Sequence, residues 1–439
     1  MNQICKIKIV GAGLAGCECA YQLLKRGYAV DLYEMRPSIQ TPVHKTGKLA
    51  ELVCSNSLKS TDINTAQGLL KYELSALDSL ILKCADKVRV PAGGALAVDR
   101  ELFSTEVEKE LGVFEKLNIV REECTDISDD VITVISTGPL TSNRLNETIS
   151  KLTGSERLHF YDAVAPIITT ESVDMKKAFY AGRYGKGGDD YLNCPMNREE
   201  YLNFYDALIN AESVILKDFE NKEIFNACMP IEIMAKKGID CMRFGPLRPV
   251  GIRVPESDER PYAVVQLRKE DNFNNLLNLV GFQTNLKFGE QKKVFSLIPG
   301  LENAEFVRYG VMHRNTYIDA PKIIKSDFSV INNENIYFAG QISGVEGYLE
   351  STMSGLITAI NIDRKLRNKK YLQMSENTAT GSLIKYLTSF NKNFQPMHVS
   401  FSLMPELEEK IRDKKLKKEK YSLRAIADVD EFVNAINKE

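Results

Sequence analysis

The first residue of chemical interest is Cys54, in the stretch LAELVCSNSLKS at residues 49–60. It stands where an apolar run gives way to small polar residues. A free cysteine usually packs as a small buried hydrophobe, so packing is the default interpretation of any single thiol. A thiol at the edge of a polar loop could also face a ligand, and the sequence around it does not decide between these two roles.

A stronger chemical signal is a glycine-rich turn made of Gly11, Ala12, Gly13, Leu14, Ala15 and Gly16. A short apolar strand precedes it, a helix closed by Gly27 follows, and a second strand ends at Glu34. In this context Gly11 permits a tight turn, Gly13 lets the backbone approach a pyrophosphate, and Gly16 allows close helix–strand packing. The helix N-terminus would hold the phosphates, and Glu34 would accept hydrogen bonds from ribose hydroxyls. The segment therefore predicts a dinucleotide site.

A second glycine-rich segment lies late in the chain, at residues 335–362, where a strand precedes a long helix of small residues. The turn between them contains Gly340, Gln341, Gly344 and Gly347. Flavoproteins with two dinucleotide-binding motifs return to their first domain in this way, and VITVISTGP at 131–139 is a third strand of that type. FAD is therefore the expected dinucleotide. We predict an α/β fold with a discontinuous Rossmann-like FAD-binding domain, residues 1–190 and 305–439, and an inserted mixed α/β domain, residues 191–304.

The composition sets limits on the class of protein. The chain has 439 residues, is 44% hydrophobic and carries a net charge of −2, so it can bury a large core and has no overall attraction for nucleic acid. Its nine cysteines form no CxxC pair, and with four histidines they offer no metal site. No signal peptide and no apolar run of about 20 residues is present. We expect a cytoplasmic protein with reduced thiols and no membrane contact.

Several longer stretches are similar to one family, the folate- and FAD-dependent tRNA (uracil-5-)-methyltransferases (TrmFO). The resemblance runs from about residue 4 to about residue 424. It rests on GAGLAGCECAYQLLKRGYAVDLYEMRP, AELVCSNSLKS, VPAGGALAVDR, STGPLTS, YLNCPMNREEY, CMPIEIMAKKG, FGPLRPVG, RPYAVVQLR, VRYGVMHRNTYI and GQISGVEGYLES. The larger MnmG flavoproteins are relatives, but they have a longer C-terminal extension that this chain lacks.

The resemblance implies an enzyme that forms 5-methyluridine in the T-loop of tRNA. In such an enzyme 5,10-methylenetetrahydrofolate supplies the carbon, FAD supplies two electrons, and NADH or NADPH reduces the flavin again. Uracil C5 is a poor nucleophile. A thiolate that adds to C6 turns the ring into an enolate whose C5 can attack a one-carbon electrophile. A general base must then remove the proton from C5.

Two cysteines match the functional positions of the family, Cys54 in ELVCSNS and Cys228 in NACMPIE. Cys228 precedes a Met-Pro pair that would hold the chain extended, and we predict that its thiol is the nucleophile at C6. Cys54 would be the partner thiol, as general base or as a transient carrier of the methylene group, and the division of roles stays open. The other cysteines are expected to have a packing role, including Cys17 and Cys19, which face different ways on their helix. Cys194 is the first candidate for an exception, because it lies in a motif that matches the family.

Two basic segments could meet RNA phosphates. The insertion cluster consists of Lys236, Lys237, Arg243, Arg248 and Arg253. The second segment is the tail, residues 407–426, which reads as a basic amphipathic helix with lysines between Lys410 and Lys420. A solvated charged face is the alternative for both. A protein without net positive charge can still bind RNA through such local clusters.

The chain departs from the family in one stretch, GFQTNLKFGEQ, where Asn285 and Phe288 stand in place of the more usual histidine and tryptophan. This change could alter contacts with folate or RNA. Some family members act on large-subunit ribosomal RNA instead of tRNA, and that target stays open. The alternatives of another class are a flavin oxidoreductase without RNA, and a flavoprotein that binds RNA and has lost turnover.

Overall fold

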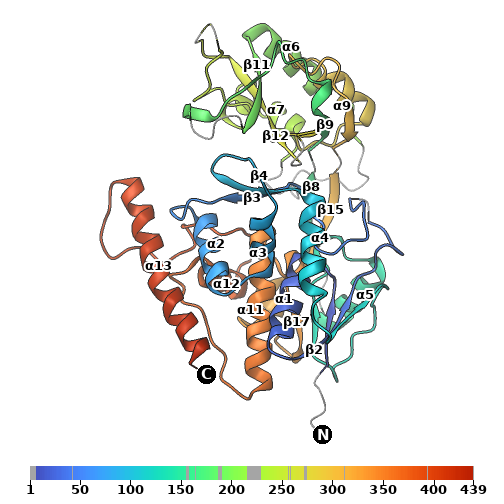
Figure 1. Ribbon diagram of the computed structural model, residues 1–439, viewed down its shortest axis with the longest axis vertical. Coiled ribbons are helices and arrows are strands. Elements are labelled where there is room, and N and C mark those ends of the chain that lie inside the picture. Colours follow the sequence, from blue (N-terminus) through green and yellow to red (C-terminus); the bar gives the residue numbers. More distant parts are fainter. Residues whose placement is uncertain are drawn as a thin grey trace.

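The computed structural model describes residues 6–41, 43–154, 158–163, 165–185, 190–214, 229–255, 257, 259–270, 274–310, 312–392 and 394–438. They form a larger first unit, at the bottom of Figure 1, and a smaller second unit at the top. Strands β8 (Leu158–Ala163) and β15 (Met312–Tyr317) pair antiparallel where the two units meet. Within the described part of the chain, no helix combines the length and apolarity that a membrane span requires.

The first unit is built on a six-stranded sheet whose strands come from both ends of the chain. The order is β16-β17-β7-β1-β2-β6, and all neighbours from β17 to β6 are parallel, whereas β16 is antiparallel. The strands are β1 (Lys6–Val10), β2 (Ala29–Tyr33), β6 (Leu117–Val120), β7 (Thr133–Ile135), β16 (Ser329–Val330) and β17 (Asn333–Phe338). The prediction of a discontinuous Rossmann-like sheet is confirmed, because β17 pairs with β7.

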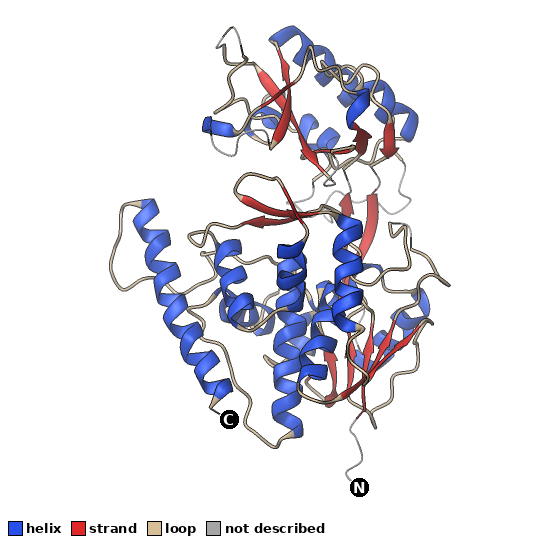
Figure 2. Ribbon diagram, in the orientation of Figure 1, coloured by secondary structure: helices blue, strands red, loops and turns tan. Residues whose placement is uncertain are grey.

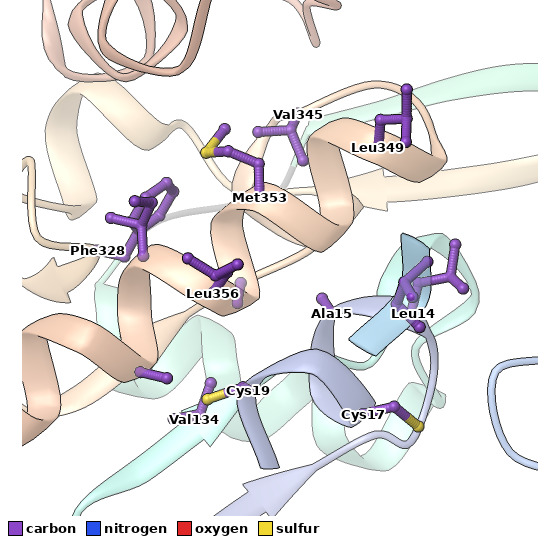
Figure 3. Packing of buried hydrophobic residues seen from close by; sticks show 14 of the residues in the cluster. Leu14, Ala15, Cys17, Cys19, Val134, Phe328, Val345, Leu349, Met353 and Leu356 are labelled. Carbon is purple, nitrogen blue, oxygen red and sulfur yellow. The ribbon is translucent and has the colours of Figure 1, made fainter. Parts of the chain in front are cut away.

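Helices α1 (Leu14–Lys25) and α11 (Tyr348–Leu366) cross closely beside this sheet. The crossing is tight at Gly355, where an added Cβ would lie 2.2 Å from the carbonyl oxygen of Ala15. Figure 3 shows the surrounding core, in which Cys17 and Cys19 project from α1 in different directions. Both thiols are fully buried, as a packing role predicts, and burial raises their pKa.

The rest of the first unit consists of helices and one small antiparallel sheet, which lies on the side toward the second unit (Figure 2). The small sheet has the order β3-β5-β4, with β3 (Ser57–Ser60), β4 (Arg89–Val90) and β5 (Ala95–Val98). The helices are α2 (Ala66–Ala76), α3 (Leu80–Lys87), α4 (Arg100–Leu111), α5 (Asn143–Thr153), α10 (Ala320–Ile323), α12 (Ala379–Thr388) and α13 (Lys414–Asn437).

The predicted start of the tail helix at residue 407 is wrong. Helix α13 begins at Lys414 because Asp413 caps it, its side chain accepting a hydrogen bond from the N–H of Leu416 at 2.7 Å. Residues 407–413 are irregular. The helix runs on to Asn437 and packs on α2 through an apolar face that includes Tyr421 and Val429.

The second unit has its own hydrophobic core under a six-stranded sheet of order β10-β11-β12-β13-β9-β14, in which every pair is antiparallel. The strands are β9 (Ile167–Thr169), β10 (Phe179–Tyr180), β11 (Tyr191–Met196), β12 (Ala263–Lys269), β13 (Leu276–Leu279) and β14 (Phe306–Arg308). The helices are α6 (Arg198–Asn210), α7 (Ile231–Lys236), α8 (Cys241–Phe244) and α9 (Phe288–Phe295). The predicted boundaries, 1–190, 191–304 and 305–439, stay a prediction, since sheet membership alone does not define a domain.

Candidate dinucleotide cleft and thiol loop

The main candidate site is a cleft at the carboxyl ends of β1, β2 and β7, which we call the dinucleotide cleft. Its empty space, counted out to open solvent, is about 1020 Å³. The glycine turn after β1 forms part of its wall, together with the end of β2, the turn at 136–142, and Gly340, Gln341 and Tyr348 from the late part of the chain. The structure thus brings together the two glycine-rich segments that the sequence singled out.

The glycine turn has the geometry that a bound pyrophosphate requires. Gly11 has a positive φ of 103°, and a Cβ there would lie 2.7 Å from the carbonyl oxygen of Ser136. A Cβ on Gly16 would lie 1.9 Å from the carbonyl oxygen of Gly11, so Gly16 serves the packing of α1 on β1 and is not part of the wall. A Cβ on Gly13 would meet nothing within 4 Å. Gly13 therefore leaves open space at the N-terminus of α1, where no side chain caps the helix.

Glu34 lies at the wall of the cleft, where Arg36, a neighbour that the sequence analysis did not identify, fixes its side chain. The guanidinium of Arg36 donates to both carboxylate oxygens, from Nε to Oε1 at 2.9 Å and from Nη2 to Oε2 at 3.0 Å. Both side chains are buried. Burial alone would raise the pKa of Glu34, but the hydrogen bonds and charge of Arg36 outweigh it and lower the pKa. Glu34 is therefore an ionised, fixed acceptor at the wall.

Arg36 is itself tied to the next loop, because its Nη1 lies 2.8 Å from Oε2 of Glu51. Glu51 also accepts hydrogen bonds from the N–H groups of Lys45 and Thr46. The wall of the cleft around Glu34 is thus a bonded network that extends from the end of β2 to the segment leading to Cys54.

The late glycine segment contributes only its first half to the cleft. Gly340 has a φ of 77°, and its N–H donates to the hydroxyl of Ser354 at 2.6 Å. Gly344 and Gly347 are absent from the described residues that line the cleft. A Cβ on Gly344 would lie 2.5 Å from the ring of Phe394, and one on Gly347 would lie 2.3 Å from Oε2 of Glu350. Gly344 and Gly347 therefore shape the turn into α11 and leave the wall to Gly340 and Gln341.

Cys54 lies in an irregular segment beside the cleft, and its side chain is half-buried. The preceding residue, Val53, lines the cleft. The hydroxyl oxygen of Tyr348, which also lines the cleft, accepts a hydrogen bond from the N–H of Cys54 at 2.8 Å. Cys124 also lines the cleft but is buried, so partial exposure beside the cleft is what distinguishes Cys54.

Cys228 and Cys5 lie outside the described residues, so the pairing of Cys54 with Cys228 stays a prediction. Cys194 is fully buried in β11, and burial raises its pKa to about 12, so its place in a matching motif reflects packing. Cys84 and Cys124 are also buried. Cys241 is half-buried in α8.

The two basic segments differ in one respect: one arginine of the insertion cluster is bound to neighbouring side chains, whereas the tail lysines are exposed. In the insertion cluster, Arg243 stacks on Tyr262, with its guanidinium carbon 3.6 Å from the ring centroid, and forms an ion pair with Asp240 at 2.6 Å. These contacts give Arg243 a structural role. In the tail, Lys414, Lys415, Lys417, Lys418 and Lys420 are all exposed at the start of α13.

The two departures from the family pattern lie in the second unit. Asn285 donates through its N–H to Glu232 at 2.8 Å and through its side chain to the carbonyl oxygen of Val214 at 3.0 Å. Phe288 is 54% exposed and stacks on Tyr309, with ring centroids 4.9 Å apart. Asn285 is therefore engaged in the local fold, and Phe288 presents one ring face to the surface.

A parallel sheet with this strand order, a glycine turn after its first strand and an acidic residue at the end of the second define a dinucleotide-binding α/β protein. The family described as "Glucose inhibited division protein A" matches residues 6–370. A protein of Natranaerobius thermophilus named "Methylenetetrahydrofolate--tRNA-(uracil-5-)-methyltransferase TrmFO" is 54% identical over 98% of this chain and 99% of its own length. A protein of Fusobacterium nucleatum with the same name is 53% identical over 96% of this chain and 97% of its own.

The chain therefore belongs to the family of Glucose inhibited division protein A and of the proteins named TrmFO. The resemblance stated from the sequence motifs is confirmed. Among solved structures, GidA of Aquifex aeolicus has a TM-score of 0.70 at 14% identity, covering 98% of this chain and 73% of its own. At that identity the likeness concerns the fold, and it agrees with the discontinuous parallel sheet described above.

Proposed function

We propose that this chain is a methylenetetrahydrofolate–tRNA-(uracil-5-)-methyltransferase that forms 5-methyluridine in the T-loop of tRNA. The observation that carries the proposal is the half-buried Cys54 beside the dinucleotide cleft, on a segment that Tyr348 ties to the cleft wall. The names of relatives at 50–54% identity over nearly the whole chain support it. A plain flavin oxidoreductase without RNA leaves both cysteine motifs without an explanation.

FAD is the proposed resident cofactor, and the residues present fit it. Gly13 leaves space where a pyrophosphate would meet the N-terminus of α1, and the fixed carboxylate of Glu34 can accept from a ribose hydroxyl. FAD, when bound and reduced by NADH or NADPH, supplies the two electrons that convert a methylene group into a methyl group. The folate that donates the carbon is a co-substrate. We propose NADH or NADPH as the reductant of the flavin.

The chain's own part of the reaction is covalent activation of the uracil. The thiolate of Cys228 adds to C6 of the target uridine, and the electron pair of the C5–C6 bond becomes available at C5. Cys54 serves as the partner thiol, and as a general base it would take the proton from C5 once the new carbon is attached. Loss of that proton and departure of Cys228 from C6 restore the ring.

RNA must be held by local positive charge, since the net charge is −2. The exposed lysines at the start of α13 are the first candidates for phosphate contact. The insertion cluster is the second candidate for phosphate contact. Arg243 has a structural role, so the candidates within this cluster are Lys236, Lys237, Arg248 and Arg253. The lysines of α13 are clustered at one end of a single helix, so they supply a local concentration of positive charge.

The test is methylation of unmodified RNA followed by nucleoside analysis. Purified protein with bound FAD is incubated with methylenetetrahydrofolate, NADPH and a tRNA transcript, and each component is left out in turn. The proposal predicts one 5-methyluridine per tRNA that requires all components. A transcript of large-subunit ribosomal RNA, supplied in place of tRNA, tests the alternative target. Flavin reduction and reoxidation without any modified nucleoside would favour the plain oxidoreductase.

A further inference from the structure

Three arginines converge on the segment of residues 52–55 that carries the half-buried thiol of Cys54, which we call the thiol loop. Each residue of the loop accepts one guanidinium hydrogen bond. Arg100 donates to the carbonyl oxygens of Leu52 and Cys54, the latter at 3.0 Å from Nη2. Arg308 donates from Nη2 to the carbonyl oxygen of Val53 at 2.6 Å.

The third arginine, Arg268, donates from Nη2 to the hydroxyl of Ser55 at 2.8 Å. The three guanidinium groups come from different parts of the fold. Arg100 is the first residue of α4 in the first unit, whereas Arg268 and Arg308 lie near the ends of strands β12 and β14 of the second unit. The thiol loop is therefore held from both units at once.

Glu270 completes the cluster. Its Oε2 lies 2.5 Å from Nε of Arg100, and its side chain is nearly fully buried. Among the described residues, Oε1 of Glu270 and Nε of Arg268 have no hydrogen-bond partner, although both atoms are buried. Buried polar groups are rarely left unpaired, so these two atoms leave the cluster with spare bonding capacity.

We infer that Arg100 and Arg308 are positioning residues for Cys54: they fix the backbone of the thiol loop at the edge of the cleft and place positive charge beside the thiol, favouring the thiolate. Both guanidinium groups are bonded to the backbone of Cys54 itself or of the residue before it: Arg100 to the carbonyl oxygen of Cys54 and Arg308 to that of Val53. A guanidinium can bridge several acceptors in fixed geometry, which a lysine ammonium cannot do. A thiolate is favoured by nearby cations.

Cations outnumber carboxylates among the charged groups around the thiol loop. Four cations, two carboxylates and one phenol face it: Arg100, Arg268, Arg308, Lys45, Glu51, Glu270 and Tyr348. Glu51 is already paired with Arg36, and Glu270 with Arg100. Burial lowers the pKa of Arg308 and the charge of Arg100 lowers it further, as expected for cations gathered at one place.

This inference rests on the proposed function only in taking Cys54 as a reactive thiol, and its deciding test needs neither folate nor RNA. The rate of alkylation of Cys54 by iodoacetamide is measured against pH in the protein with bound FAD, with the modified peptide identified by mass spectrometry. Arg100→Gln and Arg308→Gln should each move the inflection of the profile upward by about one pH unit, slowing alkylation at pH 7 about tenfold.

Arg100→Lys separates charge from geometry. It should leave the pH of the inflection nearly unchanged but lower the rate constant of methyl transfer without changing the KM for RNA, because a flexible ammonium lacks the fixed planar geometry with which the guanidinium holds both carbonyl oxygens. The matched control is Arg183→Gln, since Arg183 donates to the carbonyl oxygens of Arg248 and Val250, both at 2.7 Å, away from the thiol loop. Its profile should equal that of the unmodified protein.

The inference is overturned if both glutamine variants keep the original inflection, even if they melt at a lower temperature, because a purely structural role would do the same. If Arg100→Gln does not fold, Arg308→Gln decides alone. A shifted inflection in a protein that never methylates RNA would leave the positioning role standing and reject the proposed function.

Discussion

The hydroxyl oxygen of Tyr348 accepts hydrogen bonds from the backbone N–H groups of Cys54 and Ser55, at 2.8 and 3.1 Å. Tyr348 is the first residue of α11, and 294 positions separate it from Cys54. Burial raises the pKa of Tyr348, and the neighbouring Cys54 raises it further, so the phenol keeps its proton at neutral pH. The contact ties the backbone of the thiol loop to the wall of the dinucleotide cleft.

The first prediction concerns this contact. Tyr348→Phe leaves two N–H groups without an acceptor, which should destabilise the local fold by about 1–3 kcal/mol. We expect the rate of RNA methylation to fall about tenfold or more while FAD stays bound, since the ring still fills the wall. Single-turnover methylation and the flavin-to-protein ratio measure the two effects. The control is Tyr72→Phe, which removes a hydroxyl that lies 3.2 Å from Asp430 at the surface; equal rates in both variants would refute the role of Tyr348.

The glycine turn gives a prediction in which folding and cofactor binding separate. Gly13 has a φ of −75°, which any residue can adopt, and its Cβ would enter open space. Gly13→Val should therefore fold but lose FAD, whereas Gly16→Ala should fold poorly because its Cβ would lie 1.9 Å from a carbonyl oxygen. Flavin absorbance after gel filtration and the melting temperature distinguish the two. Gly94→Val, also with open space at its Cβ, is the control; a yellow Gly13→Val protein would mean that the pyrophosphate lies elsewhere.

Glu73 should make stability depend on pH. It is fully buried on α2 and accepts hydrogen bonds from the N–H groups of Ala379 and Thr380 at the start of α12, at 2.7 and 2.8 Å. Burial raises its pKa from 4.5 to about 7, against the opposing effect of those hydrogen bonds. The folded state therefore binds more protons than the unfolded state between these values, and stability falls as the pH rises through this window.

The magnitude of that effect follows from the shift. Between pH 4.5 and pH 7.5 the free energy of unfolding of the unmodified protein should fall by up to about 3 kcal/mol because of Glu73. The Glu73→Gln variant should not show this fall, because glutamine does not titrate. Urea unfolding midpoints of both proteins, measured across the window, test this. Curves that run parallel for the two proteins would show that Glu73 titrates at its ordinary pKa.

Binding of RNA should depend on the exposed lysines of α13. Replacing Lys414, Lys415, Lys417 and Lys418 by glutamine should weaken RNA binding and flatten the plot of log affinity against log salt, by about 0.9 for each duplex phosphate that is no longer neutralised. Oxidation of NADPH should be unaffected. A control with the same charge change replaces Lys83, Lys87, Lys109 and Lys116, which lie in or just after α3 and α4. An unchanged slope in the first variant would move the RNA site to the insertion cluster.

The sequence predicted the parts of the site that local patterns encode. The turn at 11–16, the strands around it and the return of the chain at 335–347 follow from short-range steric rules for glycine, and the structure brings them together. The ion pair between Arg36 and Glu34 could not be predicted, because the position of the Arg36 side chain depends on the loop that leads to Glu51. The start of the tail helix was placed too early because the charge pattern continues upstream of its capping residue, Asp413.

The contacts around Cys54 could not be read from the sequence for a different reason. Tyr348, Arg268 and Arg308 reach the thiol loop from positions more than 200 residues away. Tyr348 comes from the late part of the first unit, and Arg268 and Arg308 come from the second unit, so only the tertiary packing brings them there.

The most direct test of the central claim follows the methyl carbon. Protein with bound FAD is incubated with NADPH, an unmodified tRNA transcript and methylenetetrahydrofolate that carries ¹³C in its methylene group, and the nucleosides are analysed by mass spectrometry. The account predicts ¹³C in the C5 methyl group of a single T-loop uridine, and its loss in both Cys54→Ala and Cys228→Ala while NADPH oxidation continues. Unlabelled RNA from the unmodified protein, or full labelling by either cysteine variant, would contradict the account.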